Sequence, residues 1–372
     1  MLFLPVTKTH AVETNLMTNT QASVPSSLFR TKKEGGGNRI PISSLYCLKA
    51  LCALFIVGLH CPIFGQEWLD PVLRTAVPIF FMISGFFLYN DDRTQAIRHC
   101  QKACWKTIRL TIIANLIYFI LNNLTYTVFY KPLTTPASWI QFLVFGSNMN
   151  FAFWYLNAYI ETLLIFILCQ YTHTDRLLLI GIPFFLLCNL LIGKYGFIIG
   201  HHVWFHRNFI TVGIPFVGLG WLLRKYQHDI LKIISGKCSM FLFAISTLLV
   251  YAEALILKMA KVVNGGDTYF FTIPMVICMF IFCLHHPSAG SESLLETTGK
   301  KYSLDIYIYH VLVYVLLVKI TTYLHFDMGG ASALIVFFTT LLFAMIFRTA
   351  YDRTMIYIRS NTLKSGAEKE KS

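Results

Sequence analysis

The chain has 372 residues, of which 56% are hydrophobic and only 13% charged. Average soluble chains carry about 25% charged residues, so this composition excludes a soluble enzyme and indicates a membrane protein. The formal net charge is +13. The basic residues lie in short loops between apolar runs, and no stripe of interleaved aromatic and Arg side chains lies outside those runs. We therefore expect membrane lipid, and not nucleic acid, as a partner.

Residues 1–38 are polar and rich in Gly, Ser and Thr, and they lack the basic start and apolar stretch of a signal peptide. We expect a disordered tail there, a membrane domain over 39–359 and a second disordered tail over 360–372. The ten cysteines are scattered singly, without CxxC pairs, which indicates free thiols. His201, His202 and His206 lie in a loop without a companion carboxylate cluster, so we expect no metal site.

The membrane domain contains ten apolar runs, each near the length that crosses a hydrocarbon core of about 30 Å as a helix. The approximate spans are 45–64, 71–89, 109–129, 151–170, 177–193, 208–223, 238–257, 269–284, 302–320 and 331–347. Such runs satisfy their backbone polar groups as helices, whereas barrel strands alternate over about ten residues. The sequence thus predicts an all-α integral membrane protein with about ten transmembrane helices. Most Lys and Arg residues near the ends of the runs lie on the same side of the membrane as the N-terminus. Such residues favour the cytoplasmic side, and an even number of helices returns the C-terminus to it, so we expect both termini in the cytoplasm.

Ionisable residues inside membrane helices are costly, so each one is a functional candidate. These residues are Lys49, His60, Glu161, Glu253, Asp305, His310 and Lys319. Lys49 and His60 are eleven helical steps apart, which returns them to one face about 16 Å apart along the axis. On that face an ammonium can meet a phosphate and a neutral imidazole can take a proton from a hydroxyl. The alternative is that Lys49 reaches lipid head groups and His60 bonds a neighbouring helix.

Other patterns point to packing or to a polar cavity. Ser84 and Gly85 are small residues among bulky aromatics and permit close approach of another backbone. Lys106 and Arg109 lie one turn apart on one helical face, suited to a phosphate or to anionic lipid.

A second polar face lies near the start of the predicted ninth helix. Ser303, Tyr307 and His310 share that face, which suits either a polar cavity or an interhelical hydrogen-bond network.

Five of these motifs, in this order, resemble the membrane acyltransferase-3 family. The resemblance covers about residues 39–350. The motifs are Lys49 with His60, the run Val77-Pro-Ile-Phe-Phe-Met-Ile-Ser-Gly-Phe86, Lys106-x-x-Arg109, Phe153-Trp-Tyr-Leu156 and Ser303-Leu-Asp-Ile-Tyr-Ile-Tyr-His310. Two positions differ from the family's usual pattern. Lys106 stands where Arg is usual, and Ser43-Ser44-Leu45-Tyr46 stands where an Asp is often found before the helix-one basic residue.

The resemblance implies a ten-helix inner-membrane O-acyltransferase that moves an acyl group, usually acetyl, from acyl-coenzyme A to a hydroxyl of a glycan or lipid-linked saccharide. It implies His60 as the catalytic base. It also implies Lys49, Lys106 and Arg109 as ligands of the coenzyme A phosphates. A multi-pass transporter or flippase for a polar or lipid-linked substrate is the alternative, because polar residues also line transport pathways.

Further residues are candidates for lining the same cavity. For Arg74 we weigh an anionic acceptor against an ion pair with Asp70 or Glu67 in the same loop. For Glu161 we consider a position beside His60, which it would orient. The complete set of cavity candidates is Arg74, Ser84, Glu161, Ser303, Asp305, Tyr307 and His310.

Overall fold

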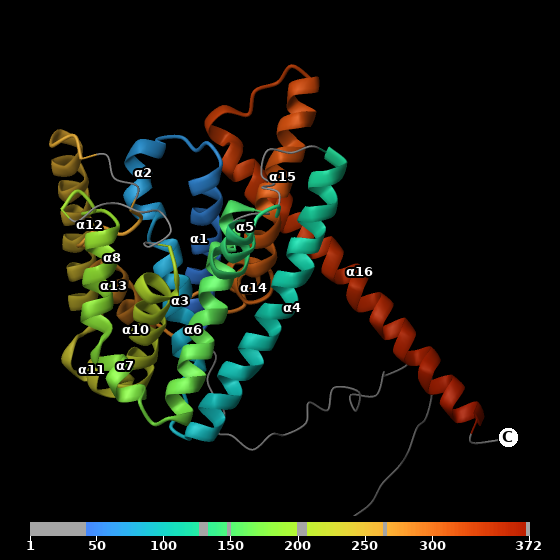
Figure 1. Ribbon diagram of the computed structural model, residues 1–372, viewed down its shortest axis with the longest axis horizontal. Helices are drawn as coiled ribbons and strands as arrows, with labels where there is room; N and C mark the ends of the chain where they lie inside the picture. The colour runs from blue at the N-terminus through green and yellow to red at the C-terminus, as the bar shows by residue number, and fades with distance from the viewer. Residues whose placement is uncertain (1–41, 126–132, 147–149, 199–206, 263–265, 370–372) are drawn as a thin grey trace, which may run out of the picture. The chain divides into compact units, whose positions relative to one another are not determined.

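The computed structural model describes residues 42–125, 133–146, 150–198, 207–262 and 266–369, and these residues form helices and connecting turns with no strand (Figure 1). The expected tail over 1–38 and the histidines at 201, 202 and 206 lie outside the described residues. By their contacts, residues 41–372 form one unit. The expectation of an all-helical domain is confirmed for the described part of the chain.

Long helices alternate with short helical segments along the chain. The longer ones are α1 (Ser43–His60), α3 (Ala76–Leu88), α4 (Arg93–Thr125), α6 (Trp154–Tyr171), α8 (Ile182–Ile192), α10 (Ile214–Lys225), α12 (Gly236–Met259), α13 (Thr272–His285), α15 (Ser303–Tyr323) and α16 (Ser332–Lys369). The short ones are α2 (Gln66–Leu73), α5 (Pro136–Ile140), η2 (Gln141–Phe145), η3 (Phe151–Phe153), α7 (Asp175–Ile180), η4 (Phe209–Gly213), α11 (Gln227–Ile233), α14 (Leu294–Thr297), η5 (Thr298–Tyr302) and η6 (Gly329–Ala331).

Seven helical segments in the described residues are long and apolar enough to cross a membrane. They are Ser43–His60, Gln66–Leu88, Arg93–Leu121, Phe151–Tyr171, Gly236–Met259, Leu294–Tyr323 and Gly329–Ala350. The other predicted runs coincide with shorter elements: α7 with α8, η4 with α10, and α13. The structure therefore supports a multi-pass membrane protein.

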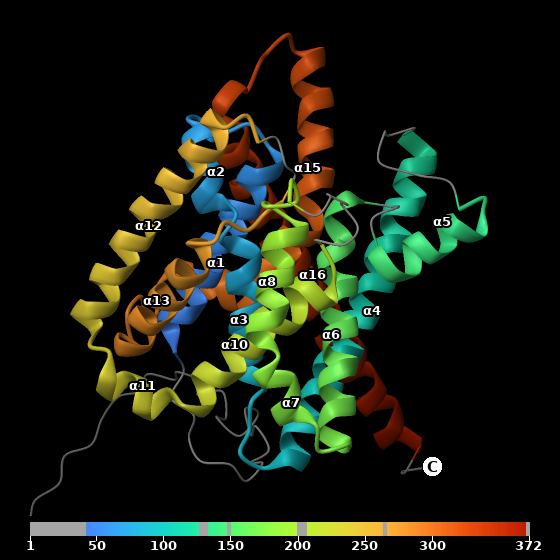
Figure 2. The same ribbon diagram turned by 60° about the vertical axis from the view of Figure 1, so that its left-hand side comes forward.

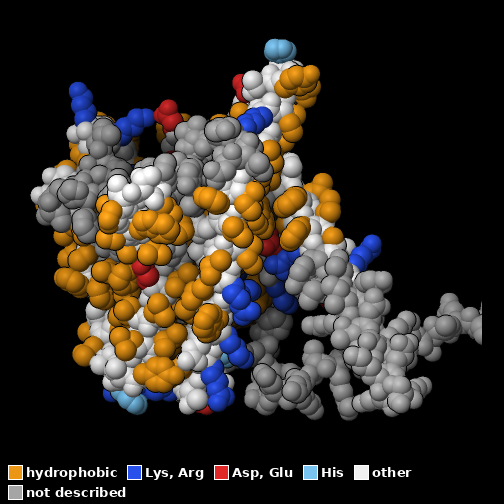
Figure 3. Space-filling model, turned by 45° about the vertical axis from the view of Figure 1, so that its right-hand side comes forward, with side chains coloured by type: hydrophobic (Ala, Val, Ile, Leu, Met, Phe, Trp, Pro, Cys, Tyr) orange, Lys and Arg blue, Asp and Glu red, His pale blue; other side chains and the backbone are white. Residues whose placement is uncertain are grey.

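The molecular surface is apolar where these helices face outward. Hydrophobic side chains cover most of the face seen in Figure 3, and Lys and Arg side chains gather toward its lower end and along the upper rim. On α12 the side chains of Phe241 and Leu248 are 65% and 70% exposed. Such a contiguous apolar surface suits contact with lipid and not with water.

Helix α1 lies among α3, α13, α15 and α16 and contributes to the main buried cluster (Figures 1 and 2). The helices α3 and α10 approach each other closely at two glycines. A Cβ atom on Gly85 would lie 2.0 Å from the Val217 carbonyl oxygen, and one on Gly220 would lie 1.9 Å from that of Met82. The predicted close approach at Ser84-Gly85 is thus confirmed, and α10 is its partner.

Helix α16 continues to Lys369, and the expectation of a disordered tail over 360–372 stays a prediction. Glu253 of α12 is buried, and its carboxylate accepts hydrogen bonds from the Tyr195 hydroxyl (2.7 Å) and from the Phe270 and Phe271 amides (2.8 and 3.1 Å). It thereby pairs the backbone amides of the two residues that precede α13. All ten cysteines are free thiols, as expected.

Candidate active site

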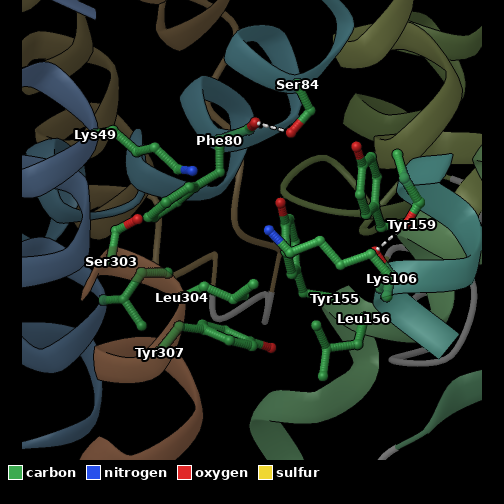
Figure 4. Close-up of a pocket in the computed structure, with 13 residues that line it drawn as sticks. Lys49, Phe80, Ser84, Lys106, Tyr155, Leu156, Tyr159, Ser303, Leu304 and Tyr307 are labelled. Carbon is green, nitrogen blue, oxygen red and sulfur yellow. Dashed lines mark hydrogen bonds between the residues drawn. The ribbon is translucent and has the colours of Figure 1, made fainter. Parts of the chain in front are cut away.

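A cavity of about 200 Å³ lies between α1, α3, α4, α6 and α15, and we call it the lysine cavity (Figure 4). It is lined by Lys49, Ile56, Phe80, Ser84, Ala103, Lys106, Thr107, Tyr155, Leu156, Tyr159, Ser303, Leu304 and Tyr307. The Lys49 and Lys106 ammonium groups point into it from opposite sides, from α1 and α4. Two like charges facing one space are stabilised by an anion between them, so this cavity suits a phosphate.

The rest of the lysine cavity is rich in hydroxyl groups. The Ser84 hydroxyl donates to the Phe80 carbonyl (2.9 Å), and the Ser303 hydroxyl donates to the Gly299 carbonyl (2.8 Å). The Tyr307 hydroxyl donates to the Ala152 carbonyl. Because the oxygens of Ser84 and Ser303 retain lone pairs, the wall presents hydrogen-bond acceptors as well as charge.

A second cavity, of about 210 Å³, lies at the other end of α1, and we call it the histidine cavity. It is lined by Ile56, Leu59, His60, Arg74, Val77, Pro78, Phe151, Ala152, Trp154, Tyr155, Arg207, Val212, Asp267, Thr268 and Tyr307. Ile56, Tyr155 and Tyr307 line both cavities. The two cavities therefore share a wall, and α1 presents Lys49 to one and His60 to the other, as the predicted shared face requires.

His60 is half-buried and packs against a second histidine. Its ring stacks on His310 with centroids 5.3 Å apart and meets the edge of Phe151 at 4.7 Å. The His310 Nδ1 atom lies 2.8 Å from the Tyr307 carbonyl oxygen and 3.1 Å from that of Ile306. Carbonyl oxygens only accept, so Nδ1 carries the proton and the neutral ring leaves Nε2 as an acceptor. That atom is buried without a hydrogen-bond partner among the described residues.

Tyr118 of α4 binds the backbone of α15 next to His310. Its hydroxyl donates to the Ile308 carbonyl (2.9 Å) and accepts from the Leu312 amide (3.1 Å). These two backbone groups lie one helical turn apart, so the hydroxyl ties α4 to α15 on both sides of His310.

Two arginines and two aspartates form an ion-pair cluster at the histidine cavity. Arg74 Nε lies 2.7 Å from Asp70 Oδ2, and its Nη1 atom contacts Asp267. Arg207 binds Asp267 with two hydrogen bonds, of 2.6 and 2.8 Å. Burial alone would lower the pKa of Arg207, but the charge and hydrogen bonds of Asp267 outweigh it and raise that pKa. The predicted Arg74–Asp70 pair is confirmed, whereas Glu67 instead pairs with Lys258 at 3.2 Å.

Four of the candidate site residues named from sequence line neither cavity. One of them, His310, stacks on His60 without lining either cavity. Arg109 Nε donates to the Trp105 carbonyl of its own helix (3.4 Å), and Arg109 lines neither cavity. Asp305 pairs with Arg348 of α16 at 2.6 Å. Glu161 lines a third space on a different face of α6 and does not meet His60.

The sequence analysis missed residues that complete the site. Tyr159 belongs to the lysine cavity, and Arg207 and Asp267 belong to the histidine cavity. Arg207 and Asp267 lie in connections between apolar runs, where an ionisable residue is ordinary and gives no signal. Tyr159 follows the aromatic motif by one helical turn, so helical periodicity from Tyr155 was the available signal.

Residues 42–349 match the Acyl_transf_3 family, described as an acyltransferase domain. The chain belongs to the acyltransferase-3 family. No curated protein and no solved structure matches it. The protein is therefore a multi-pass membrane acyltransferase, which transfers an acyl group and uses an acyl donor. This result favours the enzyme over the transporter that the polar residues alone left open.

Proposed function

We propose that this acyltransferase moves an acyl group, most simply acetyl, from acyl-coenzyme A to a hydroxyl of a glycan or lipid-linked saccharide. The observation that carries the proposal is the arrangement along α1, which presents Lys49 to one cavity and His60 to another across a shared wall. The donor occupies the lysine cavity, and the acceptor enters the histidine cavity.

Lys49 and Lys106 bind the donor through its phosphates or the polar arm beyond them. Two ammonium groups on opposite walls suit an anion, and the hydroxyls of Ser84 and Ser303 offer acceptors for the amides of a pantetheine arm. Arg109 lies outside the cavity and is a ligand of anionic lipid in this proposal.

His60 is the general base. Its imidazole takes the proton of the acceptor hydroxyl as that oxygen attacks the thioester carbonyl. The tetrahedral intermediate then expels the coenzyme A thiolate, which recovers the proton from His60. Tyr155 and Tyr307 stand at the wall where the two substrates meet. The Tyr155 hydroxyl donates to the developing oxyanion, whereas the Tyr307 hydroxyl donates to the Ala152 carbonyl and shapes that wall. His310 covers one face of the His60 ring and positions it.

The proposal also fixes an orientation. Ten crossings, with the shorter helices counted, place both termini and the Lys49 end of α1 in the cytoplasm, where acyl-coenzyme A is made. The His60 end then faces the outer side of a cell inner membrane. An acceptor that belongs to the cell envelope, such as an exported polysaccharide, reaches the histidine cavity from that side.

The test is the release of free thiol from acetyl-coenzyme A by the purified protein, supplied with lipid and glycan extract. General-base catalysis contributes about 10²- to 10⁴-fold, so His60→Ala lowers the extract-dependent rate by at least about 10²-fold. His228→Ala, on the exposed surface of α11, is the matched control and keeps the wild-type rate. A His60→Ala rate within threefold of wild type, in a folded protein, would remove His60 from catalysis. If folded wild-type protein releases no thiol from any acyl donor, the proposed reaction is wrong.

A further inference from the structure

A third space, which we call the glutamate groove, lies between α4, α6 and η2 and has a volume of about 440 Å³. It is lined by Ile108, Thr111, Ile112, Asn115, Leu116, Phe119, Phe142, Leu143, Asn157, Ile160 and Glu161. None of these residues lines the lysine or the histidine cavity, because the groove uses other faces of α4 and α6. Its volume is within the range of about 300–1,000 Å³ that small-molecule sites occupy.

The rim of the groove is apolar and faces outward. Ile112, Leu116 and Leu143 are 61%, 56% and 65% exposed. In a helix that crosses a membrane, such side chains contact lipid. The groove is therefore open to the acyl-chain region and accessible to a molecule that diffuses within the bilayer.

Three oxygen atoms in this apolar setting have no hydrogen-bond partner among the described residues. They are Thr111 Oγ1 and Asn115 Oδ1 of α4 and Glu161 Oε2 of α6, and each atom is buried. Buried polar atoms are nearly always paired, because leaving one unpaired costs about 1–3 kcal/mol. Three such atoms on residues that line one groove point to a ligand that supplies hydrogen-bond donors.

Three of the four amide donor hydrogens of the groove are already used. Asn115 Nδ2 donates to the Thr111 carbonyl (2.8 Å), and Asn157 Nδ2 donates to the carbonyls of Phe142 (3.1 Å) and Leu143 (2.8 Å). The groove thus presents mainly acceptors. A second copy of the chain, related by a two-fold axis, would bring the same acceptors and leave them unpaired. The occupant must differ from the chain itself and must carry donors on an apolar body.

We propose that the glutamate groove binds a membrane amphiphile whose head group carries hydroxyls. Its hydroxyls donate to Glu161 Oε2 and Asn115 Oδ1, and its chain lies along Ile112 and Leu116. The site is separate from the acyl-transfer site and is occupied whether or not transfer takes place.

Binding is measured with two probes added to the full-length protein in a detergent without hydroxyl groups. One probe is glucosyl diacylglycerol, and the other is the same lipid with every sugar hydroxyl acetylated, so that it has no donor. Native mass spectrometry gives the dissociation constant of each. Each of the hydrogen bonds to Glu161 and Asn115 is worth about 0.5–1.5 kcal/mol, so the hydroxylated probe binds at least about fivefold more tightly. A photoreactive chain on that probe labels α4 and α6 peptides at the groove.

Variants locate the site. Glu161→Leu and Asn115→Leu each weaken binding of the hydroxylated probe about tenfold and leave the acetylated probe unaffected. Thr247→Val is the matched control, because that hydroxyl on α12 bonds its own helix (2.8 Å) far from the groove in sequence. His60→Ala keeps the binding, which separates this proposal from the proposed reaction. If Glu161→Leu does not fold, Glu161→Gln, which keeps an acceptor but no charge, replaces it and weakens binding severalfold.

Three results would overturn the proposal. The first is equal affinity for the two probes. The second is unchanged binding in both folded leucine variants. The third is photolabelling confined to the peptides of the histidine cavity, which would assign the lipid to the acceptor site.

Discussion

The lysine cavity and the histidine cavity are each lined by two cationic side chains, but the two pairs differ in whether carboxylates bind them. Arg74 and Arg207 of the histidine cavity are bound by Asp70 and Asp267. Lys49 and Lys106 of the lysine cavity form no ion pair within the part of the chain that the structure describes. This difference indicates that the two arginines stabilise the fold, whereas the two lysines are available to bind a ligand.

The arginine cluster is structural by its geometry. Asp267 binds both Arg74, which lies between α2 and α3, and Arg207, which lies just before η4. It thereby holds two distant connections at the same edge of the histidine cavity. Its charges are balanced, two arginines against two aspartates, so the cluster offers little net attraction for an anion. The unpaired lysines keep their charge for the donor.

The largest effect we expect is from removing the shared aspartate. Asp267→Ala leaves two partly buried guanidinium groups facing each other, and breaking such a pair costs about 3–5 kcal/mol. We expect a lower unfolding midpoint in detergent together with loss of activity. Asp267→Asn, which keeps acceptors but not the charge, recovers part of the midpoint. A midpoint equal to that of the wild type in Asp267→Ala would show that the cluster does not hold the fold.

The next effect concerns the unpaired cations. Lys106→Met removes a charge-assisted contact to the donor worth about 1.5–3 kcal/mol, and so raises KM for acyl-coenzyme A roughly ten- to a hundredfold with a smaller change in kcat. Steady-state thiol release at varied donor concentration measures both constants.

The matched control is Arg109→Met, one turn along the same helix but outside the cavity. We expect a KM within about twofold of wild type, as for an ordinary surface substitution. If Arg109→Met raises KM as much as Lys106→Met does, the donor extends beyond the lysine cavity and both members of the basic pair bind it.

The comparison also shows what the sequence can and cannot predict. Lys49, His60 and Tyr307 were found because an ionisable or polar residue inside an apolar run is rare enough to be informative. Lys106 was found as one of two basic residues one helical turn apart. Helical periodicity then placed Lys49 and His60 on the same side of α1. Periodicity does not show which element covers a face, so it could not tell that Arg348 of α16 pairs with Asp305.

Pairings between connections are harder still to predict. Asp267 and Arg207 are 60 positions apart and join two segments whose sequences carry no periodic signal. Glu161 was correctly recognised as unusual, but its depth along α6 could not reveal that it faces the glutamate groove and not His60. The fold class and the ends of most long helices were predictable, because both follow from the lengths and bounds of the apolar runs.

A smaller effect tests the wall between the two cavities. Tyr307→Phe removes the hydroxyl that donates to the Ala152 carbonyl and leaves the ring in place. A buried hydrogen bond of this kind contributes about 1 kcal/mol, so the unfolding midpoint falls modestly. Because this bond holds η3 against the wall where the two substrates meet, kcat falls modestly as well. Tyr323→Phe, at an 84% exposed residue, changes neither quantity.

The smallest effect belongs to an ion pair that resembles the cluster in composition but not in burial. Glu67 and Lys258 lie 3.2 Å apart, and their side chains are 83% and 76% exposed, whereas those of Arg74 and Asp267 are 22% and 25% exposed. Exposed pairs contribute about 0–1 kcal/mol because water and salt screen them and both side chains lose freedom. Glu67→Ala therefore leaves the unfolding midpoint nearly unchanged at ordinary salt, in contrast to Asp267→Ala. A drop as large as that of Asp267→Ala would mean that charge pairing, and not burial, decides the stability of this edge.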